Sequence, residues 1–198
     1  MQYPNKKRPT ALRTSLNKQT PKHYTAHRGM NLEEDISLSN TYYLDTDRAV
    51  IYKKPIPVQI VKVDYPHRSS AKIVEAYYRT PSTTDYNGLY RGRYVDFEAK
   101  ETKTLNFPFN NIHPHQVKHL ERIQKHHGIA FLIIAFTSIN EVYLIDAKYV
   151  IDRYYVDGPR HLTYDEIKTH GHLIRQSYRP RLCYLDIIDE VYFKEESL

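Results

Sequence analysis

The sequence has few of the features that mark exported or membrane proteins. It contains one cysteine, Cys183, and a single cysteine excludes an intramolecular disulfide. No uninterrupted apolar run approaches the roughly 20 residues that a membrane-spanning helix needs. The first residues are basic and lack the apolar segment of a secretory signal. We therefore expect a soluble, cytoplasmic protein that does not associate with a membrane.

The chain also has fewer acidic than basic residues. Asp and Glu number 23 against 29 Lys and Arg, which gives a formal net charge of +6, and there are 11 histidines besides. A surplus of this size favours a polyanionic partner such as nucleic acid. At 198 residues the chain is long enough for one ordinary domain with its own core.

Two segments differ in character from the rest. Residues 1–25 are basic and have almost no periodic apolar content, so we interpret them as a flexible basic arm that precedes a folded domain over 26–198. Residues 55–79 contain Pro55, Pro57 and Pro66 around a run of apolar and basic residues. Because proline breaks long regular elements, we expect a hairpin-like projection inserted in the domain.

The remaining sequence alternates between helical and strand patterns. Asn31 is a candidate helix cap before apolar residues at helical spacing, and the pair Thr163 and Glu166 has the spacing of a capping box. We expect helices over 31–45, 113–128, 147–155, 163–171 and 182–192, and strands over 49–54, 89–100, 129–136 and 141–146. This order predicts an α/β fold with a mixed β-sheet flanked by helices.

The segment Asp-Phe-Glu-Ala-Lys, residues 96–100, places charge on alternate positions of a strand. Side chains alternate between the two faces of a sheet, so Asp96, Glu98 and Lys100 share one face. An exposed ladder of opposite charges is one interpretation. The other involves Asp85, because the turn signal Asn87-Gly88 predicts a hairpin that brings this carboxylate to Glu98.

Two carboxylates at one place suit Mg²⁺, which takes oxygen ligands. Asp85 and Glu98 are therefore candidate metal ligands, and Lys100 lies on the same face, where an ammonium can stabilise charge that develops on a phosphate. Together they predict a phosphodiester-cleaving site in which Asp85, Glu98 and Lys100 are catalytic. Mn²⁺ is also expected to occupy such a site.

The pattern of Asp85 with Glu98-Ala99-Lys100 resembles the signature of the PD-(D/E)XK nuclease superfamily. Longer stretches are similar to the RecU-type Holliday junction resolvases of Gram-positive bacteria, and they extend the resemblance from about residue 28 to 193. These stretches are RGMNLEEDI (28–36), KKPIPVQIVKVDYP (53–66), RTPSTTDYNG (79–88), DFEAKET (96–102) and FPFNNIHPHQ (107–116).

The resemblance implies a restriction-endonuclease-like fold and a homodimer that cuts four-way DNA junctions in bacterial recombination and repair. It implies that Mg²⁺ is held by Thr83, Asp85, Glu98 and Gln116, that Lys100 stabilises the transition state, and that residues 55–79 form a stalk entering the junction. It also implies action at the nucleoid, with a RecA-type recombinase and a branch-migration motor as partners.

Some of these residues have local interpretations as well. Thr83 can be a turn former and Gln116 a neighbour of a helix cap. Glu33 and Glu34 resemble an acidic helix residue that joins the site in many superfamily members, but negative charge is also favourable at a helix N-terminus for its own sake.

Basic residues beside the motifs are candidates for DNA contact, because Lys and Arg neutralise phosphates without reading sequence. Exposed aromatic rings can stack on unpaired bases. The candidate cations are Arg28, Lys53, Lys54, Arg68, Lys72 and Arg79, and the candidate rings are Tyr65, Tyr77, Tyr78, Tyr86 and Tyr90.

Two other functions are consistent with parts of the sequence. His115 and His119 lie one helical turn apart, as zinc ligands often do, although no Glu lies between them to act as general base. A junction-binding protein that modulates a recombinase without cleaving DNA would keep the basic surface. The presence of Asp85, Glu98 and Lys100 favours the nuclease over this binder.

Overall fold

The structure, a computed structural model, describes residues 31–65, 71–79 and 83–194. A six-stranded sheet has the spatial order β1-β4-β5-β7-β8-β10, and all its neighbours are antiparallel except the parallel pair β5 and β7. The strands are β1 Val50–Lys53, β4 Tyr86–Tyr90, β5 Arg93–Thr102, β7 Ile129–Phe136, β8 Glu141–Asp146 and β10 Gly171–Leu173. The expected basic arm over 1–25 lies outside the described residues.

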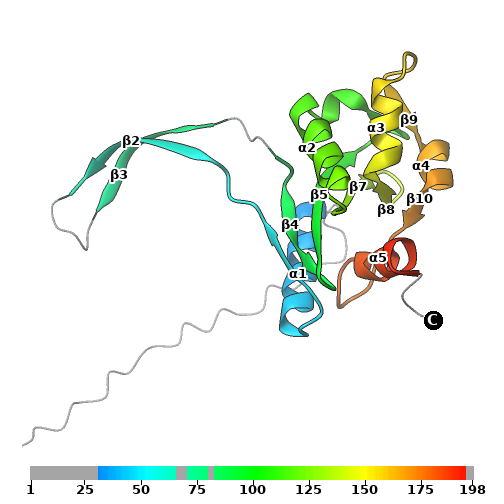
Figure 1. Ribbon diagram of the computed structural model, residues 1–198, viewed down its shortest axis with the longest axis horizontal. Coiled ribbons are helices and arrows are strands. Elements are labelled where there is room, and N and C mark those ends of the chain that lie inside the picture. The colour runs from blue at the N-terminus through cyan, green and yellow to red at the C-terminus, as the bar shows by residue number, and fades with distance from the viewer. Residues whose placement is uncertain (1–30, 66–70, 80–82, 195–198) are drawn as a thin grey trace, which may run out of the picture.

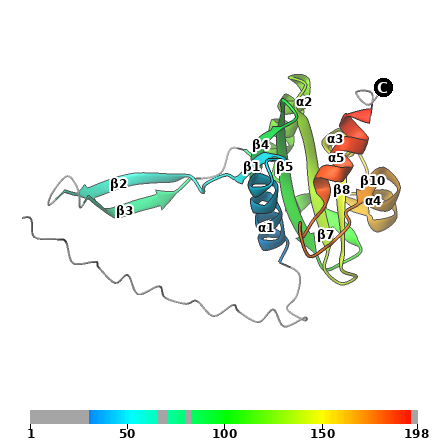
Figure 2. The ribbon, with the colours of Figure 1, turned by 90° about the horizontal axis from the view of Figure 1, so that it is seen from below.

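Helices cover both faces of this sheet (Figures 1 and 2). One face packs against α1 Leu32–Asp45 and α5 Tyr184–Tyr192, and the other against α2 Pro114–Lys125, α3 Ala147–Tyr155 and α4 Tyr164–His170. A small sheet pairs β6 Asn106–Pro108 with β9 His161–Thr163, and a 3-10 helix, η2 Phe109–Asn111, follows β6. No helix in the described ranges has the length and apolar character to cross a membrane.

Each face of the central strands has its own apolar core. On the face of α1 and α5, Phe97 of β5 stacks on Phe131 of β7 with ring centroids 4.7 Å apart. On the other face, Val117 and Leu120 of α2 pack over Leu132. All eight residues of β7 are buried, which fits the continuous apolar run of a strand covered on both faces.

The helix signals in the sequence are confirmed. The Asn31 side chain accepts a hydrogen bond from the Glu34 N–H at the start of α1, and the Thr163 and Glu166 side chains form a reciprocal capping box at α4. Helix α2 ends earlier than expected, at Lys125, and His127 has a φ of 62° before the chain enters β7.

The turn predicted at Asn87-Gly88 is wrong, although the hairpin itself is confirmed. Asn87 and Gly88 lie within β4, and the reversal occurs at Arg91 and Gly92, with φ values of 47° and 76°. Two consecutive residues with positive φ form the kind of two-residue turn that matches the twist of paired strands.

Gly88 has a different role, since β1 approaches it closely. A Cβ at this position would lie 2.0 Å from the Val50 carbonyl oxygen. We expect Gly88→Ala to destabilise the fold by about 1–3 kcal/mol or more, the usual cost of overpacking, measured by denaturant unfolding. Gly92→Asn is the control, because nothing lies within 4 Å of a Cβ there and Asn tolerates positive φ. Equal stability of the two variants would contradict this assignment.

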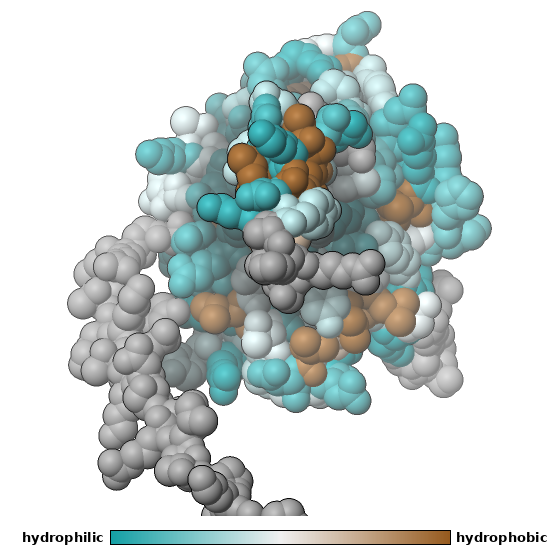
Figure 3. Space-filling view, turned by 90° about the vertical axis from the view of Figure 1, so that its left-hand side faces the viewer, coloured by the Kyte–Doolittle hydropathy of each residue, from teal (hydrophilic) through white to brown (hydrophobic). Residues whose placement is uncertain are grey.

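The predicted projection is a separate hairpin of β2 Val58–Asp64 and β3 Lys72–Tyr78. The two strands form a sheet of their own and extend away from the body on the side of β1 and β4 (Figure 1). Viewed from that side, apolar and hydrophilic side chains lie next to one another (Figure 3). The mixed sheet, its flanking helices and this projecting hairpin confirm the fold class expected from the sequence.

Candidate active site

The hairpin of β4 and β5 brings Asp85 and Glu98 together. Tyr86 pairs with Phe97 in the register, so Asp85, directly before β4, lies across from Glu98. The Asp85 backbone N–H donates to Glu98 Oε2 at 3.1 Å. The prediction that these residues, thirteen positions apart, meet at one place is confirmed.

The interpretation of this face of β5 as an exposed ladder of opposite charges is wrong. Asp96 and Glu98 are both 0% exposed, because α2 covers the face on which they lie. A buried carboxylate requires partners, since the interior solvates charge poorly. Asp96 and Glu98 therefore lie in an enclosed polar site and are not exposed charges on a solvated strand.

Glu98 has an unusual environment for a carboxylate. Burial raises its pKa to about 7, against the opposing effect of the Lys100 charge. Lys100 Nζ lies 2.7 Å from Glu98 Oε1 as an ion pair, and each oxygen of the carboxylate has a second lone pair that can still accept. An oxygen with spare acceptor capacity beside a second carboxylate suits a hard divalent cation, which favours the ionised form.

The two neutral candidate ligands, Gln116 and Thr83, make the local hydrogen bonds that their alternative interpretation predicted. Gln116 is buried, and its Oε1 accepts a hydrogen bond of 2.9 Å from the His113 N–H at the start of α2. Thr83 is half-buried, and its hydroxyl contacts the Thr84 carbonyl at 3.4 Å. A carbonyl oxygen has two lone pairs, so the cap leaves Gln116 able to accept once more.

The start of α1 lies beside the same place. Glu33 forms an ion pair with Lys53 of β1, and Glu101 Oε1 accepts a hydrogen bond of 2.7 Å from the Leu32 N–H. A pocket between these elements is lined by Asn31, Leu32, Glu33, Lys53, Asp85, Tyr86, Ala99 and Glu101. Glu33 thus lines the same pocket as Asp85, whereas Glu34 is not among the residues that line it. The sequence did not predict the role of Glu101 at the start of α1.

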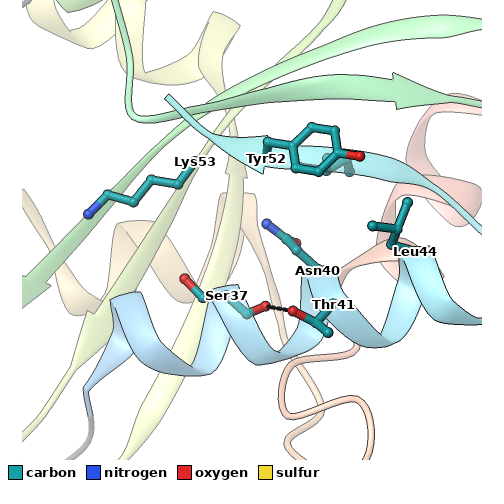
Figure 4. Close-up of a pocket in the computed structure, with 7 residues that line it drawn as sticks. Ser37, Asn40, Thr41, Leu44, Tyr52 and Lys53 are labelled. Atoms are coloured by element: carbon teal, nitrogen blue, oxygen red, sulfur yellow. Dashed lines mark hydrogen bonds between the residues drawn. The ribbon is translucent and has the colours of Figure 1, made fainter. Parts of the chain in front are cut away.

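The other predicted cations differ in what they contact. Figure 4 shows a second pocket, between α1 and β1, with Lys53 at one end and Leu44 at the other. The Lys54 ammonium is turned inward, 2.8 Å from Asp96 Oδ2. Arg79 donates twice to Gln59 Oε1 at the base of the projecting hairpin, at 3.2 and 3.1 Å. Arg28 and Arg68 lie outside the described residues.

The predicted stacking residues fall into two groups. Tyr65, Tyr77 and Tyr78 are 69%, 60% and 82% exposed, and Lys72 beside them is exposed too. Tyr86 and Tyr90 are 1% and 5% exposed, so the prediction that they stack on bases is wrong. Their rings belong to the core, where aromatic residues of strands commonly pack.

The histidines of α2 do not form a cluster. His119 Nε2 lies 3.2 Å from Asp96 Oδ2, and His115 stacks on His113 with ring centroids 5.4 Å apart. Within the described ranges, no three His, Cys, Asp or Glu side chains are grouped so that they could hold a metal ion. The candidate magnesium set instead combines two carboxylates with hydroxyl and amide oxygens.

Comparisons with known proteins agree on one family. The sequence model of the family described as "Recombination protein U", RecU, matches residues 27–190. The chain is 50% identical over 197 residues to the Holliday junction resolvase RecU of Bacillus cytotoxicus, with 98% of each chain covered. It is 48% identical, with the same coverage, to the proteins of that name in Bacillus thuringiensis and Bacillus cereus.

A comparison of solved structures finds the Holliday junction resolvase Hjc of Archaeoglobus fulgidus. It is 10% identical, covers 70% of this chain and 90% of its own, and superposes with a TM-score of 0.40.

Proposed function

The chain belongs to the RecU family, and from this premise we propose that it is a Mg²⁺-dependent endonuclease that resolves four-way (Holliday) DNA junctions by symmetric paired nicks. This activity serves homologous recombination and DNA repair in the bacterial cytoplasm. The observation that carries the proposal is the meeting of Asp85 with the buried Glu98, next to the ammonium of Lys100.

The residues divide into ligands and an electrostatic catalyst. Asp85 and Glu98 supply the charged ligands of Mg²⁺, and Thr83 and Gln116 supply neutral oxygens. Bound Mg²⁺ provides positive charge that stabilises the negative charge developing on the phosphoryl group. Lys100, which is paired with Glu98, stabilises the same charge and orients the attacking water. Strand β5, which is paired on both sides in the sheet, holds Glu98 and Lys100 more rigidly than a loop could.

DNA binding is assigned to the cations and rings on the surface. Lys53, Lys72 and Arg79, with Arg28 and Arg68 outside the described residues, contact phosphates, which positions the protein without reading sequence. Lys54 is not included, because its ammonium is paired with the buried Asp96. Tyr65 and Tyr77 on the hairpin stack on unpaired bases. A homodimer with two-fold symmetry presents two sites to symmetry-related strands of a junction, and a RecA-type recombinase and a branch-migration motor are its further partners.

The experiment that tests the function is incubation with a synthetic four-way junction, with and without Mg²⁺. Paired nicks at symmetry-related positions are expected only with the metal. Binding with intact strands would instead support the second candidate, a junction-binding protein that modulates a recombinase. The intact set of Asp85, Glu98 and Lys100 argues against that candidate.

The metal requirement gives a separate prediction. EDTA should stop cleavage, and Mn²⁺ should restore it as Mg²⁺ does, because both ions accept oxygen ligands. Zn²⁺ should not sustain a comparable rate, measured as initial nicking velocity at equal free metal. Full activity in Zn²⁺ alone would favour a site built on His115 and His119.

A further inference from the structure

Asp96 is the most highly connected buried carboxylate beside the proposed site. It is 0% exposed, and its Oδ2 lies 2.8 Å from Lys54 Nζ, 3.0 Å from the Tyr94 hydroxyl and 3.2 Å from His119 Nε2. Its Oδ1 accepts a hydrogen bond from the Thr84 hydroxyl. None of the metal and transition-state roles proposed above uses Asp96.

These partners belong to the segments that carry the proposed ligands. Thr84 lies between Thr83 and Asp85 in the chain. The Lys54 backbone N–H donates to the Asp85 carbonyl at 2.7 Å, while its ammonium also contacts the Thr84 hydroxyl at 2.9 Å. The Asp85 backbone is therefore held from both sides by residues whose side chains meet at Asp96.

The same carboxylate reaches the other two ligand-bearing elements. Asp96 precedes Glu98 by two residues in β5, so both side chains lie on one face of the strand. His119 follows Gln116 by three residues in α2, so the two share a face of that helix. One buried group thus contacts the 83–85 segment, β5 and α2.

We propose that Asp96 is a positioning residue, whose carboxylate fixes the Asp85 segment and α2 against β5 and so preorganises the metal ligands. The inference rests on the proposed function, since it presumes that Asp85, Glu98 and Gln116 hold the metal. Asp96 itself contacts neither metal nor DNA in this arrangement.

The energetics of buried charges indicate that Asp96 serves to orient the groups around it rather than to stabilise the fold as a whole. The desolvation of a buried ion pair offsets much of its attraction, so such pairs stabilise a fold weakly. Hydrogen bonds to a fixed buried acceptor are directional, however, and hydrogen-bonding residues that surround the ligands of a metal keep those ligands in the correct orientation. Their loss commonly weakens metal binding by about 10–100-fold.

The test uses Thr84→Val, which removes the hydroxyl that donates a hydrogen bond to Asp96, and Thr84→Ser, which keeps that hydroxyl. Asp96→Asn is the second variant and remains decisive if Thr84→Val fails to fold. Asn has one acceptor oxygen and a donor NH2 group, so it cannot accept both from Thr84 on one side and from Lys54 and Tyr94 on the other. The first readout is Mn²⁺ affinity by calorimetry. We expect about tenfold weaker binding in Thr84→Val and Asp96→Asn, and wild-type affinity in Thr84→Ser.

The second readout is amide hydrogen exchange of Lys54 in the metal-free protein. This N–H donates to Asp85, so its protection should fall in Thr84→Val and Asp96→Asn and stay high in Thr84→Ser. Ser39→Ala is the structural control, since Ser39 is 0% exposed and bonds the Leu182 N–H at 2.8 Å in a different part of the molecule. It should lower stability without changing either readout.

Wild-type Mn²⁺ affinity and Lys54 protection in a folded Asp96→Asn variant would overturn the inference. Failure of the wild-type protein to nick junctions in Mg²⁺ would instead count against the proposed function. The exchange measurement needs neither metal nor DNA, so it still decides whether Asp96 holds the Asp85 segment.

Discussion

We expect Asp85→Asn and Glu98→Gln each to reduce cleavage of a four-way junction to background while the protein still binds the junction. Each change removes one of the two carboxylates proposed to hold Mg²⁺, an ion that prefers charged oxygen ligands. Neither removes a cation that contacts phosphate, and junction affinity depends mainly on such cations. Loss of one negative charge beside the DNA should leave binding equal or tighter. The measurements are nicking of a labelled junction in Mg²⁺ and gel-shift affinity in EDTA.

Lys100→Ala belongs to the same experiment and should lower the nicking rate by about 10²–10³-fold, the usual cost of removing one group that stabilises transition-state charge. Glu121→Gln is the matched control, since Glu121 is a surface residue of α2 that pairs with Lys125 at 2.8 Å and lies outside the proposed site. A carboxylate variant that cuts at the wild-type rate in Mg²⁺ would show that the ligands are assigned wrongly.

The meeting of Asp85 with Glu98 could be predicted because a hairpin requires only a turn between two strand patterns. The position of the turn could not. Asn87-Gly88 has the composition of a hairpin turn, yet Gly88 lies inside β4, where the β1 backbone leaves no room for a Cβ. That demand comes from a strand more than thirty residues earlier, so local propensity pointed to the wrong glycine.

The environment of the polar face could not be predicted for a similar reason. Alternation places Asp96 and Glu98 on one face, but period-2 spacing does not say whether water or a helix covers that face. Here α2, which begins at Pro114, makes it interior. The cluster around Asp96 brings together residues as far apart in the sequence as Lys54 and His119. The spacing of residues in a sequence does not predict such contacts.

The projecting hairpin was visible in sequence from its prolines and from its lack of core partners. Its strands pair through Val58 with Tyr78 at the base and Asp64 with Lys72 toward the tip. Every residue of β3 is exposed. A two-stranded hairpin is marginally stable in water by itself, and exposed apolar residues in one place indicate a binding surface. The exposed apolar residues of the hairpin are Val58, Ile60, Val61, Tyr65, Ile73, Val74, Tyr77 and Tyr78.

Replacing residues 58–78 by a short Gly/Ser linker should abolish the preference for a four-way junction over linear duplex. The hairpin is proposed to enter the open centre of the junction, a feature that duplex DNA lacks, so without it only phosphate contacts of the body remain, and these do not distinguish the two substrates. The variant should stay folded, because neither apolar core includes a hairpin residue. It should also keep its Mn²⁺ affinity, since Asp85 and Glu98 are untouched.

The measurement is competition binding in EDTA, with labelled junction challenged by unlabelled junction or duplex. A Gly/Ser replacement of residues 156–160, an exposed loop after α3, is the control for altering a surface segment away from the hairpin, and it should preserve the preference. Wild-type discrimination by the hairpin-replaced protein would mean that junction selectivity originates in the body. In that case the two-fold arrangement of active sites in the proposed homodimer, rather than the hairpin, must recognise the four-way geometry.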